Sequence, residues 1–349
     1  MNLDSLLPRW WSPLPLFSGF TVSGADAPQF LQGQLTNDVI ALTTTRSQRS
    51  GYCTPKGRLM ATFLQWRIAE DTIGQILPSA LLERTTKRLK MFVLRSKATF
   101  SGPESTLAVS GLWFDSPAPS GLGATSGDVT LVTGLDEGQA WLIREPDDAL
   151  GARAWLIADR VAMAKIESRL QACADRRVSQ EAWLLAEIQS GKPWVWSQTV
   201  EAFVPQMINF ELVDGVSFKK GCYPGQEVVA RSQYLGKLKR RTFHGSTQLS
   251  DHDLNLLFGS RSVEGGHPLA LLIGAEVWSP SDTTQPVGQV VDAARVATPT
   301  SASDNQKVHL LIEATLEAWS AGGLMLGSLA PSSPLLSQES LPYSLTTPE

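Results

Sequence analysis

One stretch of this sequence gathers cations, a thiol, a phenol and a carboxylate around two glycines: Phe218-Lys219-Lys220-Gly221-Cys222-Tyr223-Pro224-Gly225-Gln226-Glu227. We expect Gly221 and Gly225 to adopt backbone conformations that other residues avoid, because glycine has no Cβ. Pro224-Gly225 predicts a tight turn. The residues that follow the turn, 226–231, predict a short helix.

Cys222 is the candidate reactive residue of this stretch. It lies just before the N-terminus of the predicted helix and beside Lys219 and Lys220. Both neighbours favour the thiolate, which is the form that acts as a nucleophile or a metal ligand. The alternative is a packing role, since a lone cysteine in a glycine-rich turn is often a small buried apolar residue.

The eight residues 220–227, Lys-Gly-Cys-Tyr-Pro-Gly-Gln-Glu, resemble the signature of the YgfZ family. Its members are folate-binding relatives of the glycine-cleavage T-protein that support iron–sulfur enzymes and tRNA modification. Residues 33–39, 183–191, 203–209 and 341–345 are also similar to segments of that family. The resemblance implies an α+β fold with three lobes, like that of the T-protein, and a reduced folate bound in a central channel.

The resemblance also assigns roles to individual residues. Cys222 becomes the reactive group, with Lys220 and Arg231 as its electrostatic support. Trp183 matches a tryptophan beside the folate, although a helical tryptophan is otherwise typical of a core. Asp38 matches a candidate functional carboxylate, although Asn37-Asp38 after a helix is also typical of a turn. The implied folate-binding residues are Trp183, Phe17, Gln189, Asp38, Tyr223, Glu227 and Arg231.

Gln189 departs from the pattern of the T-protein relatives, which have a glutamate at this position. A carboxylate accepts hydrogen bonds from both the exocyclic amine and a ring N–H of a pterin, whereas an amide offers one oxygen. Glu187 is two residues away on the same predicted helix, so it points elsewhere. This substitution weighs against tight pterin binding.

Composition is typical of a globular chain, with 349 residues of which 42% are hydrophobic and 18% charged. Cysteines occur at 53, 173 and 222 with no Cys-x-x-Cys pair, which argues against a disulfide framework and against a metal cage. The N-terminus has prolines among its apolar residues and no lysine ahead of them, so no secretory signal is predicted. No apolar run is long enough to span a membrane, and the expected location is the cytoplasm.

The net charge is −4, so the whole surface does not attract nucleic acid. RNA contact would require a local patch. Two candidates exist, the cluster Lys87, Arg88, Lys90, Arg95 and Lys97, and the run from Lys237 to Arg241. Such charge runs are usually solvated faces, so direct nucleic-acid binding is not expected.

Hydrophobic patterning predicts mixed helices and strands followed by a β-rich C-terminal part. Residues 1–18 read as a proline-rich arm, and Pro55-Lys56-Gly57 as a hairpin turn. The expected helices are 26–32, 80–93, 159–173 and 179–191. The expected strands are 20–23, 59–68, 107–114, 129–133, 139–144, 154–158, 240–246, 271–279, 287–296 and 307–319. We expect two interleaved α+β lobes that bind folate in 1–238, a small β-barrel in 239–330, and a tail in 331–349 that docks on the body.

Taken with the resemblance, the sequence predicts a tetrahydrofolate-binding protein that supports assembly or repair of iron–sulfur enzymes, including tRNA-modifying ones. Its partners would be the folate and, transiently, the iron–sulfur clients, with no membrane partner. Two alternatives remain, a folate-dependent aminomethyltransferase and an interaction scaffold whose folate site is vestigial. The aminomethyltransferase needs a general base beside the folate amine, for which Asp38 is the candidate.

Overall fold

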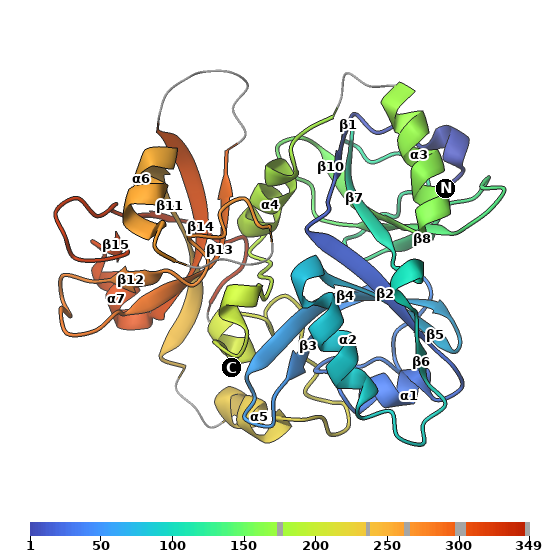
Figure 1. Ribbon diagram of the computed structural model, residues 1–349, viewed down its shortest axis with the longest axis horizontal. Helices are drawn as coiled ribbons and strands as arrows, with labels where there is room; N and C mark the ends of the chain where they lie inside the picture. Colours follow the sequence, from blue (N-terminus) through green and yellow to red (C-terminus); the bar gives the residue numbers. More distant parts are fainter. Residues whose placement is uncertain (173–176, 235–237, 262–265, 297–304, 346–349) are drawn as a thin grey trace. The chain divides into compact units, whose positions relative to one another are not determined.

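The computed structural model describes residues 1–172, 177–234, 238–261, 266–296 and 305–345 (Figure 1). The chain forms two compact units, and each is built from three separate segments of the sequence. The first unit consists of Met1–Ser50, Thr62–Gln180 and Lys219–Tyr223, and the second of Gly51–Ala61, Glu181–Phe218 and Pro224–Glu349. The cysteine-containing stretch is therefore divided between the units after Tyr223.

The N-terminal half builds two five-stranded sheets. One has the order β3-β4-β5-β2-β6, with β2 Phe17–Ser23, β3 Ser47–Cys53, β4 Leu59–Ala69, β5 Thr72–Pro78 and β6 Thr99–Phe100. The other has the order β1-β7-β10-β9-β8, with β1 Trp10–Pro13, β7 Ala108–Phe114, β8 Val129–Leu131, β9 Ala140–Arg144 and β10 Ala152–Ala158. Three helices accompany them, α1 Ala27–Gln32, α2 Leu82–Lys90 and α3 Arg160–Ala172.

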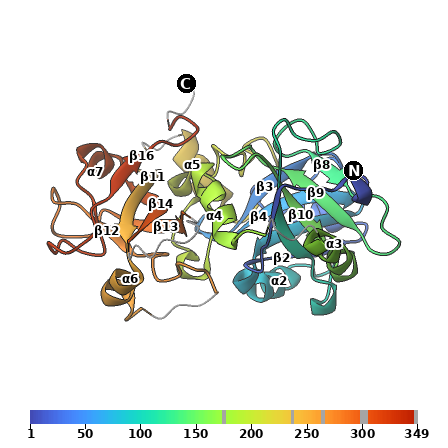
Figure 2. The same ribbon diagram turned by 90° about the horizontal axis from the view of Figure 1, so that it is seen from above.

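The core of the first unit lies between the second of these sheets and α3. Every residue of β10 is buried, and alternate side chains of this strand join Leu112 and Leu142 in one hydrophobic cluster. From α3, Met163, Ile166 and Leu170 pack into the same cluster, as expected for an apolar stripe at helical spacing. Both views place α3 beside β10 and α2 beside β2 (Figures 1 and 2).

The second unit contains a six-stranded sheet with the order β15-β12-β13-β14-β11-β16, which curls into a half-barrel. Its strands are β11 Arg240–Leu249, β12 Glu276–Trp278, β13 Gly288–Arg295, β14 Gln306–Thr315, β15 Met325–Leu326 and β16 Ser337–Glu339. The helices of the later half of the chain are α4 Gln180–Gln189, α5 Gln226–Tyr234, α6 Asp251–Phe258 and α7 Leu316–Ala321. Figure 2 shows α6 and α7 on opposite sides of this sheet.

Short 3₁₀ turns occupy several connections, at Leu3–Ser5, Ser79–Leu81, Pro103–Ser105, Ser197–Thr199 and Pro205–Ile208. Near the C-terminal end, β16 pairs with β11, and the Tyr343 hydroxyl donates to the carbonyl of Gly191 at 2.7 Å. Within the described ranges, no helix combines the length and the apolar character that crossing a membrane requires.

Several predicted boundaries are confirmed because strong local signals set them. The hairpin at 55–57 closes as expected, with Thr54 N donating to Arg58 O at 2.8 Å. Asp159 caps α3 by accepting from Ala162 N at 2.9 Å, and Gly191 adopts a φ of 63° just after α4, a conformation in which glycine is favoured.

Other expectations are wrong, and tertiary pairing explains the first. Residues 1–18 are not an irregular arm throughout, because β1 pairs along β7 from Trp10–Trp113 to Pro13–Ser110. The helix expected at 80–93 ends at Lys90. Residues 271–274 form turns before β12 begins at Glu276, and the strand expected at 307–319 stops at Thr315.

Two C-terminal helices lie where strands or loops were predicted, and both have a hydroxyl cap. The Oγ1 of Thr315 accepts from Ala318 N at 3.2 Å, and α7 begins there. Ser250 and Asp253 form a capping box at the start of α6. Both capping patterns are present in the sequence and indicate the start of a helix. The alternating hydrophobic residues around them indicate strands, so strands and loops were predicted instead.

Candidate functional site

The candidate site of the first unit is organised by Lys220, which is only 8% exposed. Its ammonium donates to the carbonyl of Gln32, the last residue of α1, and to the carbonyl of Leu35 at 2.5 Å. A cation at the C-terminal end of a helix also interacts favourably with the helix dipole. Lys220 therefore ties the cysteine-containing stretch to residues 33–39, so two motifs far apart in the sequence meet here.

The charge of Lys220 depends on this environment. Burial lowers the pKa of its ammonium to about 8, while the nearby Asp38 and Cys222 oppose the shift. The ring of Tyr223 supplies a further contact, with its centroid 4.9 Å from Nζ. Lys220 is thus mainly an ammonium at neutral pH and becomes a free amine under mildly alkaline conditions.

We expect this buried amine to give the protein a distinctive stability profile in alkali. Above pH 8 the folded state loses the Lys220 proton, whereas the unfolded chain keeps it until about pH 10.4. The unfolded state then binds more protons, so the contribution of Lys220 to the free energy of unfolding rises with pH through this window and is constant below it. Urea unfolding at pH 7 to 10 should show that the wild type gains stability relative to Lys220→Met as the pH rises.

The neighbouring Lys219 provides the control, because it is exposed. Lys219→Met removes the same charge and should run parallel to the wild type over the whole pH range. Parallel curves for Lys220→Met as well would contradict a lowered pKa at Lys220.

Asp38 lies in a turn, and its two carboxylate oxygens differ in their hydrogen bonds. Its Oδ1 accepts from Gln32 Nε2, Ile40 N and Ala41 N, each at 3.1 Å. Within the described part of the chain, its Oδ2 accepts no hydrogen bond. Asp38 therefore fulfils the turn role considered from the sequence, and it also presents an oxygen close enough to Lys220 to influence that amine.

Cys222 is exposed in the first unit, unlike Cys53. Burial raises the pKa of the Cys53 thiol to about 12, which makes that residue unreactive near neutral pH. Cys173 lies outside the described residues. Among the residues that are described, no group of three or more His, Cys, Asp or Glu side chains is arranged to hold a metal ion.

The two glycines of the stretch differ in role. Gly225 has a φ of 83° and packs against the β3–β4 hairpin, where an added Cβ would lie 2.7 Å from Gly57 Cα and collide with the Thr54 carbonyl. The expectation for Gly221 is wrong, because its φ is not positive and an added Cβ would meet no atom within 4 Å. Only Gly225 is required by geometry.

This difference predicts opposite outcomes for two alanine substitutions. Gly225→Ala should lower the free energy of unfolding by about 2–3 kcal/mol, since it combines left-handed strain with a backbone collision. Gly221→Ala should change it by less than about 0.5 kcal/mol. Denaturant unfolding of both variants measures the effect, and equal losses would contradict the contact between Gly225 and the hairpin.

The predicted folate residues Trp183 and Gln189 belong to the second unit, on α4. Trp183 is fully buried and Gln189 is exposed at the end of the helix. Glu187 is also fully buried, and its Oε2 accepts from Trp194 Nε1 at 3.1 Å. Glu187 therefore points away from Gln189, as the helical spacing predicted, and it lies in the interior. The contact of Trp183 with folate stays a prediction.

Phe17 belongs to the first unit, at the start of β2. It is 2% exposed, and its ring meets that of Trp155 edge-on with centroids 5.2 Å apart. It also borders a cavity of about 350 Å³ with Leu14 and Val109. Its stacking role, like that of Trp183, stays a prediction.

Glu227 and Arg231 are neighbours on α5 in the second unit. They form an i,i+4 ion pair with 3.5 Å between Glu227 Oε1 and Arg231 Nη2, and both side chains are largely exposed. An exposed pair of this kind contributes little to stability. Both charged groups therefore remain accessible from solvent.

A buried polar network in the second unit was missed from the sequence. Arg241 and Glu211 form an ion pair with side chains 2% and 4% exposed, and Arg241 also donates to Gln206 O at 3.1 Å. Burial raises the pKa of the Glu211 carboxyl, and Arg241 opposes that rise. Asn209 fastens the same segment to β11 by donating to Thr242 O at 2.6 Å. No local pattern reveals such pairs, because the partners are about thirty residues apart.

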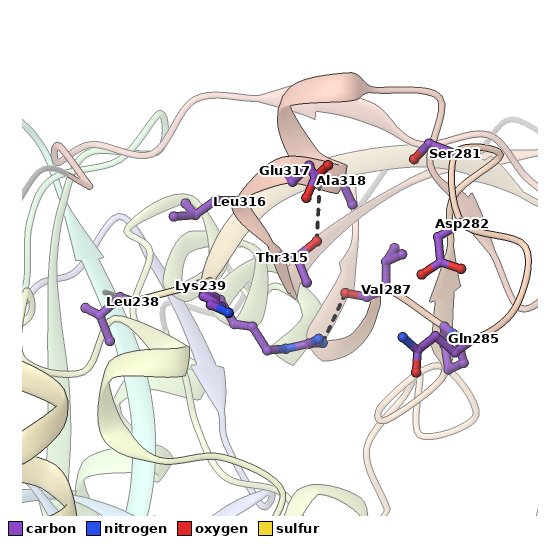
Figure 3. A pocket seen from close by; sticks show the side chains of 12 residues that line it. Leu238, Lys239, Ser281, Asp282, Gln285, Val287, Thr315, Leu316, Glu317 and Ala318 are labelled. Atoms are coloured by element: carbon purple, nitrogen blue, oxygen red, sulfur yellow. Dashed lines mark hydrogen bonds between the residues drawn. The ribbon is translucent and has the colours of Figure 1, made fainter. Parts of the chain in front are cut away.

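A pocket of about 690 Å³ opens in the second unit beside the start of α7 (Figure 3). Figure 3 shows Thr315 and Glu317 on one side and Asp282 and Gln285 on the other. The Arg240 guanidinium at its wall is engaged by Glu313 and by the Val287 carbonyl. None of the predicted reactive or folate-binding residues lines this pocket, whereas Lys239 and Arg240 of the C-terminal basic run do.

Comparisons with known proteins place these features in context. The chain is 32% identical over 252 residues to the tRNA-modifying protein YgfZ of Colwellia psychrerythraea, which covers 71% of this chain and 75% of that protein. It is also 32% identical over 284 residues to the tRNA-modifying protein YgfZ of Edwardsiella ictaluri, covering 77% and 79% of the two chains. No family model matches the chain.

Among solved structures, the fold is similar to that of the glycine cleavage system aminomethyltransferase T from Bartonella henselae. The TM-score is 0.57 at 13% sequence identity, and the match covers 95% of this chain and 85% of that one. At this identity the similarity establishes the fold alone. The α+β fold of the T-protein type predicted from the sequence is therefore confirmed.

Proposed function

The chain belongs to the YgfZ family, and from that premise we propose that it binds tetrahydrofolate and supports the assembly or repair of iron–sulfur enzymes. These clients include enzymes that modify tRNA, in keeping with the name of its relatives. The observation that carries the proposal is the cluster in the first unit, where the exposed Cys222 lies close to the buried ammonium of Lys220. We propose that the protein acts in the cytoplasm.

The donors of the first unit fit a reduced pterin chemically. A pterin presents N–H groups, and the Oδ2 of Asp38 is an acceptor without a hydrogen bond from the described residues. The γ-glutamyl end of a folate is anionic, and Lys219 of the same unit is an exposed cation. Phe17 is the aromatic candidate of this unit for the ring. When bound, a reduced folate supplies a carrier for one-carbon groups.

Cys222 performs the protein's own chemistry in this proposal. An exposed thiolate can coordinate the iron of a client transiently, or attack one sulfur of a client disulfide and release the other sulfur as a thiolate. Lys220 stays in place through the carbonyls of Gln32 and Leu35, so its ammonium remains close to Cys222. The ring of Tyr223 contacts that ammonium, and the carboxylate of Asp38 favours its charged form.

The test is the activity of iron–sulfur enzymes in cells that lack the protein. We expect activity and cluster occupancy to fall, and a plasmid copy of the wild-type gene to restore both. Normal cluster occupancy in the deletion strain would contradict the proposal. The alternative, a folate-dependent aminomethyltransferase, has a separate assay. Such an enzyme would form methylene-tetrahydrofolate from an aminomethyl-lipoyl protein above the level of a control without enzyme. We expect no such product.

A further inference from the structure

The two basic clusters noted in the sequence differ in how their charge is used. In the C-terminal cluster, Arg240 is paired with Glu313 and Arg241 with the buried Glu211. Lys237 lies outside the described residues. Two guanidinium groups of the C-terminal cluster are therefore neutralised by carboxylates of the protein, so their role is to stabilise the fold.

The other cluster lies on α2 and in the turns that follow it, where Arg84 adds a further cation, and its charges are not neutralised in this way. Its cations are exposed, and none of them has an acidic partner in the described part of the chain: Arg84, Lys87, Arg88, Lys90, Arg95 and Lys97. No Asp or Glu occurs from Arg84 to Pro103. Elsewhere in the same unit several exposed cations are paired, such as Arg9 with Asp115 and Lys165 with Asp136. The α2 face, defined as residues 84–97, therefore carries six cations without ion pairs, next to one exposed carboxylate, Glu83, on a chain whose net charge is −4.

Exposed apolar side chains accompany these cations. Leu94 is 87% exposed and Phe92 is 43% exposed, in the turns that follow α2. Leu94 also has a φ of 46°, a conformation that is uncommon for a leucine. An exposed aromatic ring among unpaired cations is the arrangement that stacks on the bases of single-stranded nucleic acid.

A pocket of about 440 Å³ opens on the same helix. Lys87 and Lys90 border it together with one carboxylate, Glu83, and Phe20 and Leu82 contribute apolar lining. The Oγ of Ser101, also in the lining, accepts from Thr21 N at 3.0 Å, so its own O–H remains available to donate. A planar base can occupy an apolar pocket of this size, while the two lysines meet its phosphate.

We infer that the α2 face binds single-stranded RNA and that one unstacked nucleotide enters this pocket. The cations contact phosphates, and Phe92 stacks on a neighbouring base. A membrane surface accounts for the cations and for Leu94, but it does not account for a pocket flanked by two lysines. An acidic protein accounts for the charge alone. The inference goes beyond the proposed function, because it gives the protein a direct contact with RNA.

The experiment is fluorescence anisotropy of the full-length protein with a labelled single-stranded RNA, over a range of salt concentrations. Lys87→Gln with Arg88→Gln should weaken binding about tenfold and reduce the slope of log K against log salt by about 1.4, since each lost phosphate contact removes about 0.7. The control combines Arg9→Gln with Lys165→Gln, which removes the same charge from paired positions. The control should bind within about twofold of the wild type and keep its slope.

A second variant tests the pocket separately from the charge. Gly102 lines the pocket, has an ordinary φ, and would present an added Cβ to open space. Gly102→Phe should therefore fold normally and block the pocket. It should weaken single-stranded RNA binding several-fold while leaving the weaker binding of an RNA duplex unchanged, because a duplex keeps its bases stacked.

Unchanged RNA affinity and salt slope in the Lys87/Arg88 variant would overturn the inference. So would binding to phosphatidylserine vesicles or to polyglutamate that depends on these cations in the absence of RNA binding. Tetrahydrofolate titration of the same variants separates this outcome from the proposed function. If the protein binds tetrahydrofolate but not RNA, only the inference about the α2 face is rejected. If it binds RNA but gives no heat with tetrahydrofolate, only the proposed function is rejected.

Discussion

Replacing Cys222 with serine is expected to abolish the restoration of iron–sulfur enzyme activity in cells that lack the protein. Serine keeps the size of the side chain in the exposed turn, so the variant should fold and bind tetrahydrofolate as the wild type does. It removes the soft, ionisable sulfur on which bonding to a client depends. The measurement is cluster occupancy and activity of a client enzyme after expression of the variant from a plasmid.

Cys53 supplies the matched control for this experiment. It is buried, and burial raises its pKa to about 12, so Cys53→Ala should leave activity in cells intact as long as the protein folds. In the purified protein with Cys173 replaced by alanine, iodoacetamide should label Cys222 far faster than Cys53 at neutral pH. Full restoration by Cys222→Ser would return this residue to a packing role.

Truncation of Trp183 is expected to have the second large effect, on folate affinity. Trp183→Ala should weaken tetrahydrofolate binding by at least about tenfold, since loss of one stacking surface commonly costs 1–3 kcal/mol. Trp183→Phe keeps a ring and should retain most of the affinity. The measurement is calorimetric titration of each variant below its melting temperature.

Because Trp183 is fully buried, its removal also leaves a cavity that destabilises the second unit by about 3–5 kcal/mol. Trp194→Ala controls for this effect, because Trp194 is equally buried in the same unit. That variant should lose stability and keep its folate affinity. Equal losses of affinity in the two variants would show that Trp183 acts only through packing.

The sequence predicted those parts of the fold that neighbouring residues determine. The turn at Pro55-Lys56-Gly57 and the cap at Asp159 each depend on atoms within a few residues, and both are confirmed. The pairing of β1 with β7 joins residues about a hundred positions apart. A short proline-containing segment carries no local sign of such a partner, so it was predicted as an arm.

The candidate site shows the same division. The motif itself identified Cys222, Lys220 and Gly225 as unusual residues. The sequence could not show that Lys220 donates to the carbonyls of Gln32 and Leu35, because that contact joins residues 185 or more positions apart. It could not distinguish the two basic clusters either, because their ion pairs with Glu211 and Glu313 depend on the folded sheet.

Calorimetric titration of the wild-type protein with tetrahydrofolate tests the central claim most directly. We expect saturable heat with one site of micromolar affinity, which corresponds to about 8 kcal/mol at standard state. The absence of saturable heat up to millimolar ligand would contradict the claim that this protein binds a reduced folate.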